Sequence, residues 1–149
     1  HLAPHCTSHQ FYKGVMAEKG RGGFYGQIIV RPGAMKTDAG QINKNLLLSE
    51  SAQVDTRPRL EIFADDVKCA HGAAVGRLDE EAVFYLCSRG LPQKEARAVL
   101  TYAFANEMAD RMPLLPVRSY VKQMLSTRFG NIGADESGSP GDEYTPFEV

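Results

Sequence analysis

The sequence predicts a mainly β protein with some α structure, in which a β-solenoid is followed by a small C-terminal helical domain. Short runs of β-branched and aliphatic residues recur between residues 22 and 76, and their centres at Ile28, Leu46 and Ile62 lie 18 and 16 residues apart. This nearly regular spacing of strand centres favours a solenoid over a β-sandwich. The strands also lack the Asn-Gly and Asp-Gly dipeptides that are typical of tight hairpins. From Asp79 onward, apolar residues follow the three- and four-residue spacing of amphipathic helices.

The solenoid part is expected to cover residues 1–78. Turn-forming clusters at residues 31–33 and 55–58 are expected to separate its strands, and the glycine-rich stretch at residues 20–26 is interpreted as a turn. The strands are predicted at residues 24–30, 42–48, 60–64 and 67–75.

The helical part is expected to cover residues 79–130 and to hold three helices. Asp79 can cap the first, and Gly90 can end it. Pro92 opens the second, which Pro113 and Pro116 are expected to end, and Gly130 follows the third. The third helix is predicted to have an apolar face formed by Val117, Tyr120, Val121, Met124 and Leu125. Residues 131–149 carry five acids and no bases, so an acidic, disordered tail is predicted there.

Composition restricts the function classes. The 149 residues contain 17 Lys and Arg against 18 Asp and Glu, and the net charge of -1 argues against nucleic acid as a partner. Apolar runs are far shorter than the roughly 18 residues of a membrane-spanning helix, so no membrane insertion is expected. The three cysteines are expected to be reduced thiols of a cytoplasmic protein. Because the chain begins at His1 without a signal-peptide pattern, it is expected to be a processed form or a fragment.

Cys69 and His71 are the strongest candidate site residues. Residues i and i+2 of a strand share a face, so the thiol and the imidazole could bind one soft metal or form a nucleophilic pair. A metal would need further ligands from another segment or chain, because two do not complete a tetrahedral site. The alternative is a half-buried cysteine beside a surface histidine.

Other candidate groups give weaker signals. His1, His5, Cys6 and His9 lie close together, but Pro4 argues against the helix that would align them, and a polar strand or loop near an exposed end is expected. Cys87 is predicted to be a core thiol of the first helix. The sequence contains neither a nucleotide-binding P-loop nor a Gly-x-Ser-x-Gly nucleophile elbow.

Three long motifs, at residues 37–49, 54–72 and 78–90, closely resemble the SufD branch of the SufB/SufD family. These proteins are scaffold subunits of the SUF iron–sulfur cluster assembly machinery. Gly72 agrees with the SufD branch, because SufB sequences tend to carry glutamate there. The resemblance implies a right-handed parallel β-helix followed by a helical domain. It also implies that this chain is the C-terminal portion of a protein of several hundred residues.

The resemblance also implies partners and roles. A SufB-like scaffold would pair through the β-helix, and a SufC-like ATPase would bind the helices, where Arg89 and Arg97 are expected to contribute. Cys69 and His71 match positions at the SufB interface, where a nascent iron–sulfur cluster is thought to form transiently with ligands from the partner. No tightly bound cofactor and no catalytic residue are expected, so the chain is predicted not to be an enzyme.

Two enzyme hypotheses compete with this scaffold. The main alternative is a stand-alone β-solenoid enzyme of the polysaccharide-processing type, but the predicted strands offer few inward carboxylates. A thiol enzyme that uses Cys69, with His71 as its base, would lack an identifiable third group to orient the base.

The N-terminal end of the solenoid is expected to be open. Its unpaired strand edge and apolar interior predict that isolated chains associate as symmetric homodimers, joined strand to strand. If the chain were instead a monomer, residues 1–11 would have to fold over this end as a cap.

Overall fold

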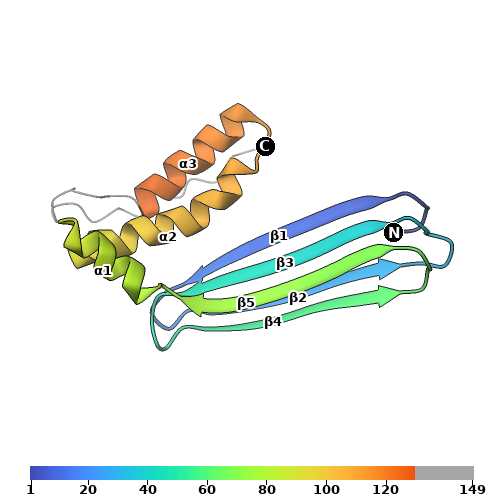
Figure 1. Cartoon of the computed structure of the whole chain (residues 1–149), viewed down its shortest axis with the longest axis horizontal. Coiled ribbons are helices and arrows are strands. Elements are labelled where there is room, and N and C mark those ends of the chain that lie inside the picture. The colour runs from blue at the N-terminus through green and yellow to red at the C-terminus, as the bar shows by residue number, and fades with distance from the viewer. Residues whose placement is uncertain (130–149) are drawn as a thin grey trace, which may run out of the picture.

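The computed structural model describes residues 1–129, which form five strands and three helices (Figure 1). The strands are β1 (Thr7–Met16), β2 (Arg21–Val30), β3 (Asp38–Leu47), β4 (Gln53–Ile62) and β5 (Lys68–Arg77). The helices are α1 (Glu80–Ser88), α2 (Gln93–Asp110) and α3 (Leu115–Phe129). The predicted tail and the predicted stop at Gly130 lie outside the described residues.

All strand pairs are parallel, and successive strands alternate between two sheets. One sheet has the order β1-β3-β5, and the other pairs β2 with β4. Thr7 pairs with Asp38, and Asp38 pairs with Lys68, so the chain returns to the same sheet after 31 and then 30 residues. The predicted combination of a β-rich part with C-terminal helices is confirmed.

The strands are longer than predicted, and two predicted turns were wrong. Residues 55–58 lie inside β4. Proline is tolerated there because β4 is an edge strand, which among residues 1–129 pairs with β2 alone. Of residues 20–26, only Gly20 belongs to a turn, in which its N–H donates to the carbonyl of Ala17. The rest are in β2, whose inward glycines make room for side chains of the opposite strands.

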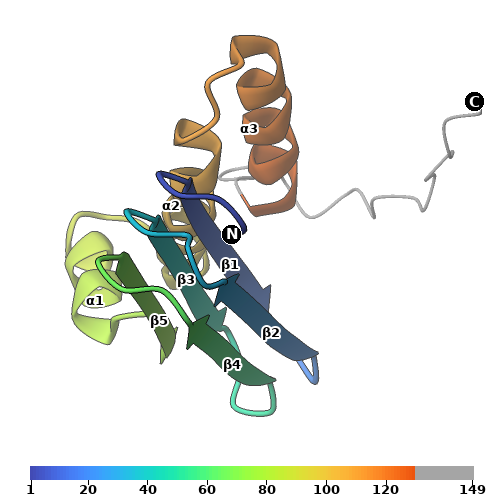
Figure 2. The same cartoon turned by 90° about the vertical axis from the view of Figure 1, so that its right-hand side faces the viewer.

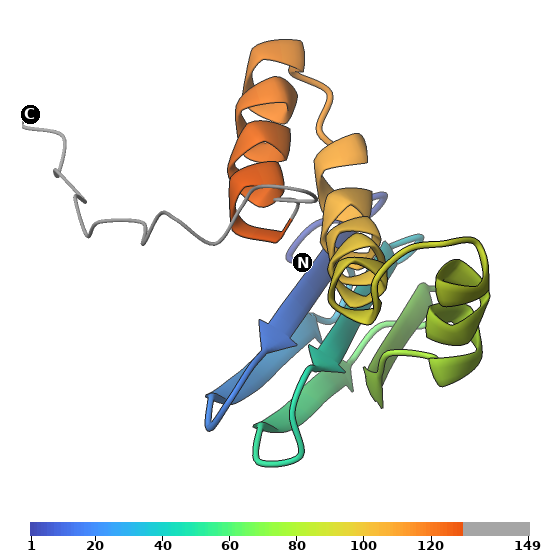
Figure 3. The ribbon, with the colours of Figure 1, turned by 90° about the vertical axis from the view of Figure 1, so that its left-hand side faces the viewer.

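Two apolar clusters hold the layers together. Ile28, Val30, Ala34 and Ala39 lie between the two sheets at one end of the strands. The second cluster joins the three-stranded sheet to the helices, and its buried members are Leu46, Leu78, Val83 and Ala96. Cys87 packs against this second cluster, as predicted for a core thiol. Figures 2 and 3 show the helical layer on the side of the β1-β3-β5 sheet.

The first two helices begin where local signals place them. The Asp79 side chain caps α1 by accepting a hydrogen bond from the N–H of Glu81 at 2.9 Å. Gly90 follows with a φ of 98°, which glycine adopts readily. Pro92 immediately precedes α2. The expectation that Pro116 ends the second helix was wrong: α2 ends at Asp110, and Pro116 lies in the first turn of α3, where its missing N–H costs no hydrogen bond.

The third helix packs less than predicted. No residue of α3 is buried, and Val117, Tyr120 and Met124 of its predicted apolar face are 46%, 60% and 55% exposed. The helix contacts α2 and lies away from the sheet (Figure 2), so this apolar side of α3 is left uncovered by residues 1–129. Among residues 1–129, the helices are too short or too polar to cross a membrane.

Candidate functional site

Cys69 and His71 lie on β5, the outer strand of the three-stranded sheet. Cys69 pairs in register with Ala39, and His71 pairs with Gln41. Both partners are buried between the sheets, so the two candidate residues occupy inward-facing positions of one strand. Within the described residues, β5 has β3 as its sheet neighbour on one side and none on the other.

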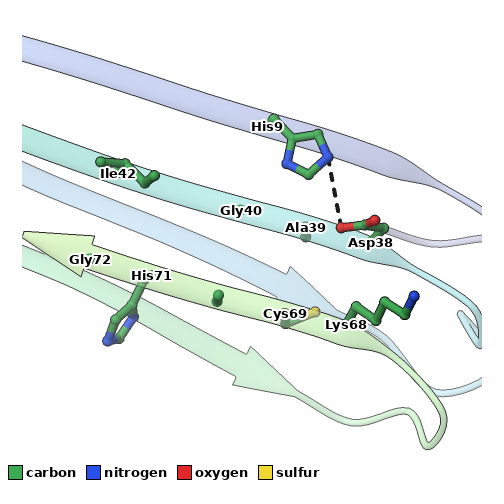
Figure 4. A pocket seen from close by; sticks show the side chains of 10 residues that line it. His9, Asp38, Ala39, Gly40, Ile42, Lys68, Cys69, His71 and Gly72 are labelled. Atoms are coloured by element: carbon green, nitrogen blue, oxygen red, sulfur yellow. Dashed lines mark ion pairs between the residues drawn. The ribbon is translucent and has the colours of Figure 1, made fainter.

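The two side chains have different environments. Cys69 is half-buried against the apolar cluster that includes Ile28 and Ala39, whereas His71 is exposed. Figure 4 shows the imidazole projecting from β5 away from the side on which Asp38 and Ile42 lie. A partly shielded thiol beside an accessible imidazole therefore sits at the sheet edge, and together they offer two ligand types suited to soft metals.

A shallow groove of about 530 Å³ runs along the same strands (Figure 4). Its lining includes the small residues Gly40, Ala70 and Gly72. At one end, the Nε2 atom of His9 lies 3.7 Å from Asp38 Oδ1. The groove therefore follows β1, β3 and β5 across the sheet. His9 pairs with Gly40 and lies on the outer face, opposite to the inward positions of Cys69 and His71.

The other N-terminal candidates are not brought together. The ring of His1 is hydrogen-bonded to Ser8 Oγ at 2.9 Å, and the backbone nitrogen of His1 donates to the carbonyl of Ile29. The expected polar strand was right from Thr7 onward, because β1 pairs with β3 along its whole length. Within residues 1–129, no three His, Cys, Asp or Glu side chains are grouped as a metal site would require.

Arg89 and Arg97 lie in different settings within the helical layer. Arg97 Nη1 donates to Glu80 Oε1 at 2.8 Å and so ties α2 to α1. Arg89 follows α1, and its guanidinium lies 5.3 Å from the centre of the Tyr85 ring. Arg89 is exposed, and Arg97 is half-buried.

A polar interior between the two sheets was not predicted from the sequence. Asn45 Nδ2 donates to Asn43 Oδ1 at 2.6 Å, and Thr56 Oγ1 of the opposite sheet donates to the same oxygen at 2.7 Å. Gln41 Nε2 donates to Gln10 Oε1 at 2.8 Å. Every second residue from Ala39 to Asn45 faces the interior, and three of these four residues are amides. This pattern could be interpreted only after the structure had shown which positions face inward.

Gly26 of β2 is the residue that admits Gln41. A Cβ atom placed at Gly26 would lie 2.4 to 2.6 Å from the amide atoms of Gln41. We expect Gly26→Ala to lower the free energy of unfolding by about 1–3 kcal/mol, the usual cost of overpacking. Urea denaturation followed by circular dichroism measures this loss. Gly76→Ala is the control, because no atom lies within 4 Å of its added Cβ, and equal midpoints for the two variants would contradict the prediction.

Comparison with known proteins gives one consistent relationship. The family described as "SUF system FeS cluster assembly, SufBD core domain" matches residues 1–104. The chain is 50% identical over 107 residues to the iron–sulfur cluster assembly protein SufD of Escherichia coli, which covers 72% of this chain and 25% of that protein. An iron–sulfur cluster assembly SufBD family protein of Synechocystis is 42% identical over 125 residues, covering 84% and 28%. SufD of Bacillus subtilis is 38% identical over 113 residues, covering 76% and 25%. The chain thus spans about a quarter of the length of these relatives.

Proposed function

Because the chain belongs to the SufBD family of the SUF iron–sulfur cluster assembly system, we propose that it serves as a non-catalytic, SufD-like scaffold element of that system. Its strands would be coils of a right-handed parallel β-helix. The return of the chain to each sheet after 30 to 32 residues, always in parallel register, supports this architecture. The cytoplasm is the proposed location.

The central element of the proposal is the edge of β5. A second scaffold chain of the SufB type would pair here and supply the ligands that this chain lacks. Cys69 and His71 would then contribute a thiolate and an imidazole to a nascent iron–sulfur cluster, the cargo of the complex. The observation that carries the proposal is their placement on one face of a strand with an unpaired edge among the described residues.

The helical layer is the proposed contact for a SufC-like ATPase. Phe84 and Tyr85 of α1 are 75% and 57% exposed, and the side of α3 described above adds further apolar surface. Aromatic side chains of this kind act as anchors in protein interfaces. Movement of the ATPase would reach the sheet through α2, which contacts β1.

The charges of the sheets favour a scaffold over the polysaccharide-processing alternative. None of the inward-facing positions of the five strands holds an Asp or Glu. The outward carboxylates are paired: Asp38 lies near His9, Asp55 accepts from Tyr25 and Arg57, and Glu61 lies 3.4 Å from Arg59. A hydrolase of this type needs a pair of carboxylates flanking the scissile bond.

The test uses the full-length parent, co-expressed with its SufB-like and SufC-like partners. We expect the double variant Cys69→Ala/His71→Ala to form the complex normally but to lose most of the iron and acid-labile sulfide that the wild-type complex holds after anaerobic reconstitution. Cys87→Ala is the matched control, since Cys87 is another half-buried free thiol and lies on α1, outside β5. Unchanged iron and sulfide content in the double variant would refute the assigned role.

A further inference from the structure

Three polar side chains form a row across the inner face of the β1-β3-β5 sheet. Gln10 pairs in register with Gln41, and Gln41 pairs in register with His71. Neighbouring strands lie about 4.8 Å apart, so side chains at one level of a parallel sheet are direct neighbours. The middle member, Gln41, therefore lies between an amide on one side and an imidazole on the other.

The orientation of the Gln41 amide is fixed on the β1 side. Its Nε2 atom donates to Gln10 Oε1 at 2.8 Å, and the amide packs against the backbone of Gly26 in the opposite sheet. The side chain is 1% exposed, yet its Oε1 atom has no hydrogen-bond donor among the described residues. A buried acceptor without a donor lowers the stability of the folded state, and such atoms are nearly always hydrogen-bonded in proteins. We therefore expect this oxygen to have a donor.

We propose that Gln41 Oε1 accepts a hydrogen bond from an imidazole N–H of His71, and that Gln41 is thereby a positioning residue for His71. The Nε2 atom of Gln41 is hydrogen-bonded to Gln10 on the β1 side. The Oε1 atom of the same amide is therefore on the opposite side, where β5 lies. His71 is the residue at that level of β5 and carries the N–H that the oxygen lacks. In the structure the ring is exposed and makes no hydrogen bond with any residue in the range 1–129, so none of these residues holds it in its present orientation.

This bond would select one histidine tautomer. The nitrogen that donates to Gln41 keeps its proton, and the second nitrogen presents a lone pair away from β3, toward the open edge. Metal-binding histidines are oriented by such a bond from the second ring nitrogen. The role of the lone pair toward a cluster rests on the proposed function, whereas the bond and the tautomer do not.

Nitrogen-15 spectra of the His71 ring in the 149-residue chain test the bond directly, at a pH where histidine is neutral. We expect the wild-type ring nitrogens to show the widely separated shifts of one tautomer, together with a slowly exchanging ring proton. In Gln41→Met, which keeps the length of the side chain but removes the acceptor, the separation of the two shifts should fall to less than half. Gln41→Glu restores an acceptor and should restore the separation.

Gln27→Met is the matched control, because Gln27 is an exposed glutamine of β2 and its replacement leaves the row of Gln10, Gln41 and His71 intact, so the separation of the shifts should equal that of the wild type. Methyl resonances of Ile28 and Val30 report whether each variant retains the packed sheets. Averaged shifts in the wild-type chain would overturn the proposal, and so would equal separations in the wild type and Gln41→Met. Either result would leave the cluster assay on the full-length complex unaffected, so the two proposals fail separately.

Discussion

Replacing Phe84 with serine in the full-length parent is expected to weaken binding of the proposed SufC-like ATPase partner by roughly 30-fold or more. The side chain is 75% exposed on α1, so it contributes little to the core, and truncation of a central aromatic anchor costs about 2 kcal/mol or more in an interface. Isothermal titration of the purified scaffold with the ATPase subunit measures the change.

Tyr25→Ser is the matched control for this experiment. Tyr25 is 70% exposed, but it lies on the β2-β4 sheet, away from the helices. Equal affinities for Phe84→Ser and the wild type would place the ATPase elsewhere. The arginines give a second comparison: Arg89→Ala should weaken binding directly, whereas Arg97→Ala should act mainly through the lost contact with Glu80 and so also lower stability.

Removing all three helices would be a poor test of the same interface. Leu46 of β3 and Leu78 are buried against Val83 and Ala96 of the helices, so a chain that ends before α1 would expose this cluster. Loss of ATPase binding in such a truncation would not separate a lost surface from a damaged sheet. Single exposed side chains avoid this ambiguity, because their replacement leaves the cluster buried.

Local signals in the sequence were sufficient to predict those features that depend only on residues close together in the chain. The Asp79 cap, the glycine stop at Gly90 and the apolar spacing of α1 are all short-range features, and each is found as predicted. The same-face placement of Cys69 and His71 also follows from strand geometry alone. These features need no knowledge of what packs against them.

The interior could not be predicted because two sheets determine it together. In residues 42–46 the apolar residues are not the ones between the sheets, because Asn43 and Asn45 are buried there and Ile42 is 41% exposed. Hydrogen bonds across the interior stabilise these amides, and Leu46 is covered by the helices. Likewise, the glycines of β2 resemble a turn until the side chain of Gln41 is placed against Gly26.

The edges of β1 and β2 left unpaired within residues 1–129 are where the predicted homodimer would form. His1 lies beside the end of β2, where the N–H of Arg31 donates to the carbonyl of His1, but β1 and β2 each keep one edge unpaired among the described residues. Strand-to-strand association of isolated chains stays a prediction.

The contact between β1 and α2 depends on one buried cation. The Lys13 side chain is 5% exposed, and its Nζ atom donates to the carbonyl of Phe104 at 2.6 Å and to Glu107 Oε2 at 2.5 Å. The Phe104 ring centre lies 4.1 Å from the same nitrogen. The hydrogen bond from Lys13 lowers the pKa of Glu107 below the ordinary value of 4.5, with smaller contributions from the charges of Lys13 and Lys44, although partial burial opposes the shift.

We expect Glu107→Ala to lower the free energy of unfolding at pH 7 by about 3 kcal/mol, because it leaves the ammonium group of Lys13 buried without its counter-charge. This is the lower end of the usual range, since Glu107 itself is 42% exposed and solvent screens part of the interaction. Urea unfolding of the 149-residue chain measures the loss. Glu81→Ala, an exposed glutamate in the first turn of α1, is the control and should cost far less.

The pH dependence separates this ion pair from simple packing. A carboxylate whose pKa is lowered by folding stabilises the folded state above its unfolded pKa, and the contribution disappears as the pH falls through the folded value. The difference between the wild type and Glu107→Ala should therefore be largest above pH 4.5 and should shrink in more acidic solution. Lys13→Met in the Glu107→Ala background should recover most of the stability, because an apolar side chain needs no counter-charge there. A pH-independent difference, or no recovery in the double variant, would show that the carboxylate of Glu107 acts through packing and not through the buried charge of Lys13.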